Sequence, residues 1–424
     1  MISSDTSTPV QTPVHRTPEE PRFQPGMTGA GLLGVMFQVC EQMGVSDIQI
    51  RSDLPAYIET HRGMECLAQL GVLSSKDVYE IYVELLRNRE SADHGFGATE
   101  SSEERAGRKL EEAIESFKQK MVDDFSCNGI FVVATGKTSG RLRIQVHLSA
   151  TGLGVTCRIL NDSIPRLDTL GIDQDTAEML RTGVLRRAGL CLVTGPTGSG
   201  KSTTLASIID WARRHHPKHI VTVEDPVEYQ YPVDMDDPNV PGQRCMAPSI
   251  VTQQEVGRDV ASYKQGLKDV LRKAPHIILL GEIRDREAME TCMEAAQTGH
   301  LVLSTLHTTG AVKTMGRILE MYPRENHPAV LNRLSEIMIF IHSQGLLNGP
   351  NGRVLTYEFL QNNEDAVSSA IAGYDKGARA LEDVIKRAGN IAWDDKLELL
   401  YQEGKISKDT FESARMHRED VEYV

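Results

Sequence analysis

The residues with the clearest chemical potential lie between Gly195 and Ser202, in the sequence GPTGSGKS. They fit the pattern G-x-x-x-x-G-K-[ST], in which glycines let the backbone curl so that successive N–H groups face the phosphates of a nucleotide. The motif is preceded by the apolar segment GLCLVT and followed by KSTTLASIIDWARR, which has helical composition. We predict a strand, a phosphate loop and a helix in this order, with the positive end of the helix dipole directed at bound phosphate.

The motif predicts both a ligand and a metal. The ammonium group of Lys201 is expected to neutralise β- and γ-phosphate oxygens of ATP, and the hydroxyl group of Ser202 to ligate Mg²⁺. The structural alternative is a glycine-rich turn that only joins a strand to a helix. The predicted nucleotide-binding residues are Gly195, Pro196, Thr197, Gly198, Ser199, Gly200, Lys201, Ser202 and Thr203.

Three further apolar segments end in residues that are suited to catalysis. These are VTVED with Glu224 and Asp225, IILLGE with Glu282, and LVLSTLH with His307. Strands that are apolar on both faces and separated by helices indicate a parallel sheet that is covered on both sides. Because the carboxyl ends of parallel strands meet at one edge of the sheet, we expect these side chains to lie near Lys201.

Most of these residues also have a structural alternative. Glu224 would then only cap the loop that follows its strand. His300, which precedes the last of the apolar segments, would only satisfy a turn. The charged run 284–286 would be a solvated surface. Glu282 is harder to explain in this way, because an unpaired carboxylate beside buried apolar residues is costly.

Composition and charge narrow the class of protein. The chain has 424 residues, of which 40% are hydrophobic and 5% aromatic, and its formal net charge is −13. This balance disfavours a protein that holds nucleic acid in a basic groove with stacked bases, so we expect no direct specific nucleic-acid binding. The 7 cysteines include no CxxC pair, which disfavours a zinc ribbon or a disulfide framework. No apolar run has the length of a transmembrane helix and no secretory signal pattern is present, so we expect a cytoplasmic protein.

Composition and periodicity divide the chain into five segments. The first is rich in proline and poor in large apolar residues, which predicts a disordered tail. The second predicts a mixed α/β domain with antiparallel strands, including strands over 130–134, 142–148 and 155–160 and a helix over 75–86. The predicted segments are the tail 1–26, the N-terminal α/β domain 27–160, a linker 161–175, the domain that holds the phosphate loop, 176–361, and a helical C-terminal region 362–424.

Four motifs of the chain resemble those of one family. The motifs are GPTGSGKSTTL, VTVEDPVEY, IILLGEIRDRE and TGHLVLSTLHTTGA, and they resemble the signature boxes of the secretion and pilus ATPases, the PilT/GspE-type (type II/IV secretion) superfamily. SDIQI with PAYIETHRG, and DFS with RLRIQV, resemble the N-terminal domain of that family. The resemblance implies an α/β protein with a RecA-like P-loop NTPase domain, a smaller PAS-like N-terminal domain and a helical C-terminus.

The resemblance also implies roles for single residues. The residue that matches the activator of the attacking water is Glu224, and the one that helps to position Mg²⁺ is Glu282. The histidines matching His300 and His307 are associated with nucleotide-dependent coupling in the family.

Arginines of the N-terminal domain reach the nucleotide across the domain cleft in this family. The matches here are Arg143 in RLRIQV and Arg158 in TCRIL, and a third arginine of the family is replaced near Ala150. The implied catalytic residues are thus Glu224, Glu282, Arg143, Arg158, His300 and His307, and the implied metal ligands are Ser202 and Glu282.

One segment favours a branch of the family. We interpret 231–266 as an insertion, and its portion APSIVTQQEV resembles the DotB/TraJ-type ATPases of type IVB secretion and IncI-like plasmid conjugation. The resemblance therefore implies a cytoplasmic homo-hexameric ATPase that drives a secretion or conjugative transfer machine and docks on its inner-membrane components. The alternatives are a type IV pilus assembly or retraction motor, a nucleic-acid motor and a nucleotide-binding scaffold that does not hydrolyse ATP.

Overall fold

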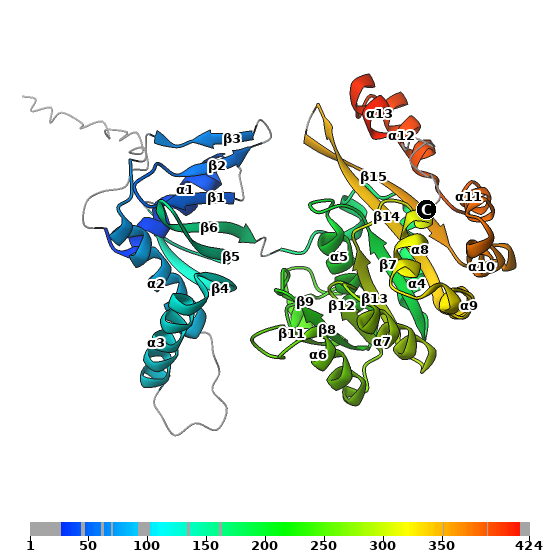
Figure 1. The fold of residues 1–424 in the computed structure, drawn as a ribbon, viewed down its shortest axis with the longest axis horizontal. Helices are drawn as coiled ribbons and strands as arrows, with labels where there is room; N and C mark the ends of the chain where they lie inside the picture. Colours follow the sequence, from blue (N-terminus) through cyan, green and yellow to red (C-terminus); the bar gives the residue numbers. More distant parts are fainter. Residues whose placement is uncertain are drawn as a thin grey trace, which may run out of the picture. The chain divides into compact units, whose positions relative to one another are not determined.

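The chain folds into two compact units that divide between Leu160 and Asn161 (Figure 1). Each unit has a hydrophobic core of its own. The predicted disordered tail, 1–26, lies outside the described residues. The computed structural model describes residues 27–43, 47–60, 63–68, 71–91, 102–133, 136–160, 163–350, 352–387 and 389–415.

The first unit is built on one antiparallel sheet with the strand order β3-β2-β1-β6-β5-β4. Apolar side chains of its helices and of the sheet form a single core, in which Leu33, Ile58 and Tyr82 are fully buried. The elements are α1 (Gly29–Met43), β1 (Asp47–Arg51), β2 (Tyr57–Thr60), β3 (Gly63–Cys66), α2 (Ser75–Ser91), α3 (Ser102–Lys120), β4 (Val122–Val133), β5 (Gly136–Ser149) and β6 (Gly152–Leu160).

Two elements of this unit are longer than their sequence pattern predicts. The strand expected over 130–134 is the end of β4, which pairs with β5 from Val122 opposite His147 to Val133 opposite Gly136. Its polar first half becomes strand because cross-strand hydrogen bonds and neighbours, rather than intrinsic preference, decide β structure. The helix expected over 75–86 continues to Ser91 in α2.

The second unit is built on a seven-stranded sheet with the order β11-β8-β12-β13-β7-β14-β15 (Figure 1). Neighbouring strands are parallel from β11 to β14, and β15 is antiparallel to β14. Its strands are β7 (Gly189–Thr194), β8 (His219–Glu224), β11 (Ile250–Glu255), β12 (Ile277–Leu280), β13 (Leu301–Leu306), β14 (Met338–Gly349) and β15 (Gly352–Gln361).

Helices cover both faces of this sheet, as the wholly apolar strands require. Alternate residues of β7 belong to two separate cores, Leu190 and Leu192 to one and Cys191 and Val193 to the other. No helix of the described ranges is both long and apolar enough to cross a membrane. The helices of eight residues or more here are α4 (Gln174–Val184), α5 (Lys201–His215), α6 (Tyr263–Val270), α7 (Arg286–Gln297), α8 (Ala311–Glu320), α9 (His327–Ile337), α10 (Asp365–Ala372) and α12 (Trp393–Gln402).

The ends of the second unit pack into its body. Leu167 and Ile172, from the predicted linker, are buried in the core that contains Val193. The helical C-terminal region adds α10 and the shorter α11 (Arg379–Ile385) to the main core. Beyond them, α12 and α13 (Lys408–Ala414) form a small cluster around Trp393 and Leu397, which packs on Leu347 and Val354 of the β14–β15 hairpin.

Candidate nucleotide-binding and catalytic site

The loop between β7 and α5 has the shape of a phosphate cradle. Gly195, Gly198 and Gly200 have φ values of 146°, 77° and 87°, a region that L side chains rarely adopt. A Cβ atom at Gly195 would overlap the backbone oxygen of Gln344 on β14. Gln344 also donates from Nε2 to the backbone oxygen of Ser199 at 2.6 Å. The neighbouring strand therefore fixes the curl of the loop, and only glycine fits at its first position.

Lys201 begins α5 and points back into this loop. Its Nζ donates to the backbone oxygens of Gly195 at 2.8 Å and of Pro196 at 2.9 Å, and the residue is 8% exposed. Burial lowers the pKa of Lys201, while the negative charges of Glu282 and Glu228 oppose this shift. The ammonium group thus lies inside the loop, where the motif places the phosphates of a nucleotide.

The next two residues of α5 carry hydroxyl groups. Ser202 is exposed in the first turn of the helix, where a hydroxyl oxygen is open to a hard cation such as Mg²⁺. Thr203 lies within hydrogen-bonding distance of the Tyr229 hydroxyl group, at 2.9 Å between Oγ1 and Oη. Tyr229 belongs to the loop that follows β8, so this contact ties that loop to the helix of the phosphate motif.

Glu282, Arg284 and His307 form a cluster at the carboxyl ends of β12 and β13. Nε2 of His307 is 3.1 Å from Oε1 of Glu282, and Nε of Arg284 donates to Oε2 of Glu282 at 3.0 Å. Nη1 of Arg284 also reaches Oδ2 of Asp225 at 3.3 Å. Nδ1 of His307 is 3.5 Å from Oγ1 of Thr197 in the phosphate loop. The structure therefore brings Glu282 and His307 together beside the loop, and the charged run at 284–286 is not only a solvated surface.

Glu224 lies at the carboxyl end of β8, the neighbour of β12. Its Oε1 accepts a hydrogen bond from Oγ1 of Thr222 at 2.7 Å and one from Nε2 of Gln253 at 3.3 Å. The residue as a whole is partly exposed, whereas its carboxyl group is enclosed by protein atoms. This burial raises the pKa of Glu224 to about 7. The negative charge of Glu228 also raises this pKa, whereas the two hydrogen bonds lower it. A carboxyl group that titrates near neutral pH suits a general base.

His300 does not join these side chains within the chain. It precedes β13, whereas His307 follows that strand, and a strand of this length separates its ends by about 20 Å. Its backbone N–H donates to the carbonyl oxygen of Ala295 at 3.1 Å, and its Nδ1 lies 3.3 Å from the same oxygen. Within this chain the histidine therefore ties the end of α7 to the start of β13, and its role in nucleotide-dependent coupling stays a prediction.

Arg143 and Arg158 lie in the first unit, directly opposite each other on β5 and β6. Directly opposed residues of an antiparallel pair project from the same face of the sheet. Nε of Arg158 donates to Oδ1 of Asp47 at 2.6 Å, and the Arg158 side chain is 54% exposed. The structure thus places both arginines on one face of the first unit's sheet.

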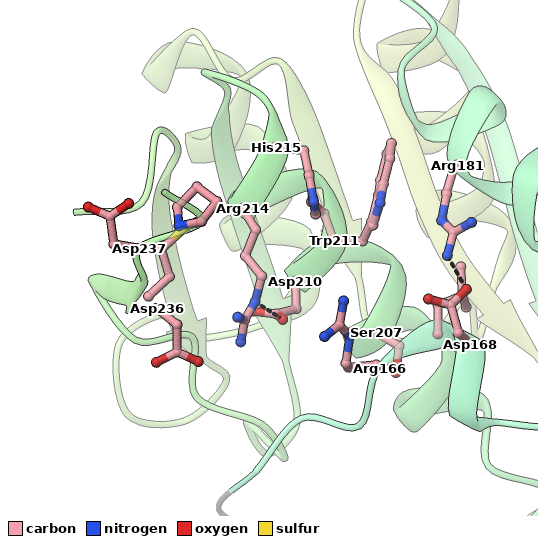
Figure 2. A pocket seen from close by; sticks show the side chains of 13 residues that line it. Arg166, Asp168, Arg181, Ser207, Asp210, Trp211, Arg214, His215, Asp236 and Asp237 are labelled. Carbon is pink, nitrogen blue, oxygen red and sulfur yellow. Dashed lines mark hydrogen bonds and ion pairs between the residues drawn. The ribbon is translucent and has the colours of Figure 1, made fainter. Parts of the chain in front are cut away.

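A cavity of about 250 Å³ lies farther along α5 and is lined by none of the predicted site residues (Figure 2). Trp211 stands between the ring of His215, at 5.2 Å, and the guanidinium group of Arg181, at 5.7 Å. Arg181 is paired with Asp168, and Nε of Arg214 contacts Oδ2 of Asp210 at 2.6 Å. Arg181 and Arg214 are thus each paired with a carboxylate in the wall of the cavity.

The segment interpreted as an insertion is part of the ATPase sheet. β11 runs parallel to β8, from Ile250 opposite His219 to Glu255 opposite Glu224. Beyond the sheet there is a small antiparallel ribbon formed by β9 (Asp234–Asp236) and β10 (Arg244–Met246). The portion that resembles the type IVB ATPases therefore supplies an edge strand of this sheet.

Comparison with known proteins decides the family. The model for the family described as "Type II/IV secretion system protein" matches residues 126–392. The chain belongs to this family. It is 33% identical over 312 residues to the type IV pilus ATPase PilU of Pseudomonas aeruginosa. The aligned region covers 72% of this chain and 75% of PilU.

Solved structures of similar fold agree with this family. The crystal structure of the pilus retraction motor PilT with bound ADP has a TM-score of 0.71 and 30% identity, and covers 91% of this chain and 97% of that one. The X-ray structure of the Legionella pneumophila ATPase DotB has a TM-score of 0.72 and covers 93% and 97%, but its 22% identity shows the fold alone. The predicted superfamily and the predicted RecA-like fold with an N-terminal α/β domain and a helical C-terminus are confirmed.

Proposed function

We propose that this member of the type II/IV secretion family hydrolyses ATP at the carboxyl edge of the second sheet and drives a cell-envelope machine. The observation that carries the proposal is the enclosed carboxyl group of Glu224 at the end of β8, in the same parallel sheet whose strand β7 leads into the phosphate loop with Lys201. Lys201 would supply positive charge for the phosphates, and Glu224 would supply a proton acceptor.

The residues present fit a nucleoside triphosphate with Mg²⁺. The loop leaves no room for a side chain at Gly195, and its amide groups and Lys201 would hold phosphate oxygens. Ser202 and Glu282 would hold Mg²⁺, which supplies further charge neutralisation on the phosphates when bound. Glu224 would take a proton from the attacking water, because two donors fix its orientation and its raised pKa keeps it basic near neutral pH. His307, between Thr197 and Glu282, would couple the loop to the metal ligand.

We also propose a homo-hexamer in which the first unit of one subunit completes the site of another. Arg143 and Arg158, on one face of the first unit's sheet, would then reach the phosphates of a neighbouring subunit. An arginine supplied in this way can raise the rate of phosphoryl transfer by about 10³-fold or more. The ring would work at the cytoplasmic face of the inner membrane and dock on protein components of the machine.

Two branches of the family compete for the identity of that machine. The resemblance of APSIVTQQEV to the DotB/TraJ-type ATPases favours type IVB-like secretion or plasmid conjugation. The second candidate is a type IV pilus motor, which is favoured by the similarity to PilU and to PilT. The position of APSIVTQQEV in the ATPase sheet reduces its weight as a marker of the branch.

Two variants test the chemistry. Lys201→Ala is expected to weaken ATP binding and turnover together, whereas Glu224→Gln is expected to keep ATP binding and lose turnover, because only the proton acceptor is removed. Glu294→Gln, an exposed position on α7, is the matched control and should behave as the wild type. Normal hydrolysis by Glu224→Gln would exclude Glu224 as the base.

A deletion strain separates the two branches. Loss of conjugative transfer or protein secretion with normal pili would support the first branch, and loss of pilus-dependent motility would support the second. Complementation with Lys201→Ala should fail in either case, because both machines would depend on ATP turnover. Normal transfer, secretion and motility in the deletion strain would contradict both candidates.

A further inference from the structure

One amide side chain on β11 links Glu224 to the loop that follows β8. Nε2 of Gln253 donates to Oε1 of Glu224 at 3.3 Å and to the backbone oxygen of Tyr229 at 2.7 Å. Oε1 of Gln253 accepts the backbone N–H of Tyr231 at 3.1 Å. Both hydrogen atoms of the amide nitrogen and its oxygen are thus engaged, which leaves the side chain one orientation.

The register of the sheet explains why Gln253 can do this. β11 is parallel to β8, and Gln253 lies directly beside Thr222. Both side chains donate to the same carboxylate oxygen, Oε1 of Glu224. Two donors on one oxygen restrict rotation of the carboxyl group and stabilise its ionised form. A third contribution of this kind comes from the backbone of Glu228.

The same amide connects Glu224 to the phosphate motif. The loop that it holds through Tyr229 and Tyr231 also contacts α5, where the Tyr229 hydroxyl group is 2.9 Å from Oγ1 of Thr203. A displacement of the first turn of α5 would therefore be transmitted through Tyr229 to Gln253, and from there to Glu224.

We propose that Gln253 is a positioning residue for Glu224, which orients the carboxyl group, favours its ionised form and ties it to the nucleotide-binding helix. This inference rests on the proposed role of Glu224 as the base. Glu224 would make the direct contact with the attacking water, and Gln253 would act only through Glu224.

Other ionisable groups lie near the same carboxyl group and also influence its ionisation. The negative charge of Glu228 disfavours ionisation of Glu224 and so raises its pKa, as burial does. The phenol groups of Tyr231 and Tyr263 lie close enough to feel the Glu224 charge. The charged groups that surround Tyr263 in turn are Asp225, Glu282 and Arg284.

The test compares Gln253→Leu with Gln254→Leu. Gln254 is the next residue of β11 and contacts Nζ of Lys273 instead of Glu224, so it is a matched control for loss of an amide from this strand. We would measure kcat for ATP hydrolysis from pH 5.5 to 9, together with the affinity for a nonhydrolysable ATP analogue.

For Gln253→Leu we expect the acidic limb of the kcat profile to move upward by about one pH unit, which corresponds to about 1.4 kcal/mol. At pH 7 this shift lowers kcat about fivefold, and the rate recovers at pH 9. The analogue affinity should stay within about twofold of the wild type, and Gln254→Leu should show the wild-type profile. An unshifted acidic limb in a folded Gln253→Leu protein would overturn the proposal, whatever its rate.

A second variant covers the case in which Gln253→Leu does not fold. Gln253→Glu keeps the acceptor for the Tyr231 backbone but places a carboxylate beside Glu224, so it should move the acidic limb farther upward. Failure of this inference is distinguishable from failure of the proposed base. If Glu224→Gln hydrolyses ATP normally, the base assignment is wrong. If Glu224→Gln is inactive but neither Gln253 variant shifts the profile, only the role of Gln253 is wrong.

Discussion

A buried lysine in the C-terminal region gives a stability prediction that is specific to this structure. Nζ of Lys396, on α12, is 2.7 Å from both carboxylate oxygens of Asp173, which precedes α4. Lys396 is 4% exposed and Asp173 44% exposed. Tyr357 contacts both residues, with its ring 4.8 Å from Nζ and its hydroxyl group donating to Oδ2 of Asp173 at 2.7 Å. This network joins the helical C-terminus to the first helix of the ATPase unit.

Because Lys396 is buried and Asp173 is partly exposed, the two single substitutions should lower the free energy of unfolding by different amounts. Asp173→Asn leaves a buried ammonium group without its counter-charge, which should lower the free energy of unfolding by about 3 kcal/mol. Lys396→Met leaves a carboxylate that water can reach, so the cost should be about 1 kcal/mol. In the double variant no charge is left unpaired, and its cost should fall short of the sum of the single costs by about 2 kcal/mol.

The assay uses a natural reporter inside the same region. The chain has 2 tryptophans, and Trp393 begins α12, where its indole N–H donates to the backbone oxygen of Ala414 at 2.9 Å. In a Trp211→Phe background, fluorescence during urea unfolding therefore reports on the C-terminal helices. Lys408→Met is the matched control, because Lys408 forms an exposed pair with Glu412 at 3.6 Å, and its cost should stay below about 0.5 kcal/mol.

The test is which of the two single variants lowers the free energy of unfolding more. Equal costs, or a larger cost for Lys396→Met, would show that the unpaired lysine is not what destabilises the protein. Additive costs in the double variant would show that Asp173 and Lys396 do not interact in the folded state.

Three further predictions concern the site. Because the pKa of Glu224 is raised to about 7 and the base must be ionised, kcat of the wild type should fall about tenfold from pH 8 to pH 6; a flat pH profile of ATP hydrolysis over this range would contradict the assignment. Gly195→Ala places a Cβ against the Gln344 backbone at a φ of 146°, so nucleotide affinity, measured by titration with a fluorescent ATP analogue, should fall about tenfold or more; unchanged affinity would show that the loop adapts. Arg158→Ala should lower kcat of the proposed ring about 10³-fold while the exposed Arg353→Ala does not; equal steady-state rates of these two variants would exclude Arg158 as an arginine that acts on the nucleotide of a neighbouring subunit.

Local sequence patterns were sufficient for the phosphate loop and for most of the ATPase sheet. The loop and Lys201 are contiguous in the chain, so one motif fixes both their shape and their chemistry. The strands β7, β12 and β13 are buried at every residue, and a short run of apolar residues is what such a position requires. The polar half of β4 carried no such pattern, because its strand conformation depends on pairing with β5.

Resemblance to motifs was a poorer guide to position. TGHLVLSTLH suggested two histidines of similar role, but the strand between them places His300 and His307 at opposite ends of β13. Likewise, APSIVTQQEV resembled a branch-specific insertion, yet its register with β8 makes it an edge strand. For APSIVTQQEV, the motif did not indicate the place of the strand in the sheet.

The sequence by itself determined that this protein has a phosphate loop after an apolar strand of a parallel sheet, and that Glu224, Glu282 and His307 follow other apolar strands of that sheet. Only the tertiary structure decided which neutral groups support them. Gln344 reaches Ser199 across 145 positions of the chain, and Gln253 reaches Glu224 across 29. An amide has no characteristic spacing or motif, and its effect depends on hydrogen bonds made at about 3 Å. Such contacts are set by strand order and register, which form only when the whole sheet has folded.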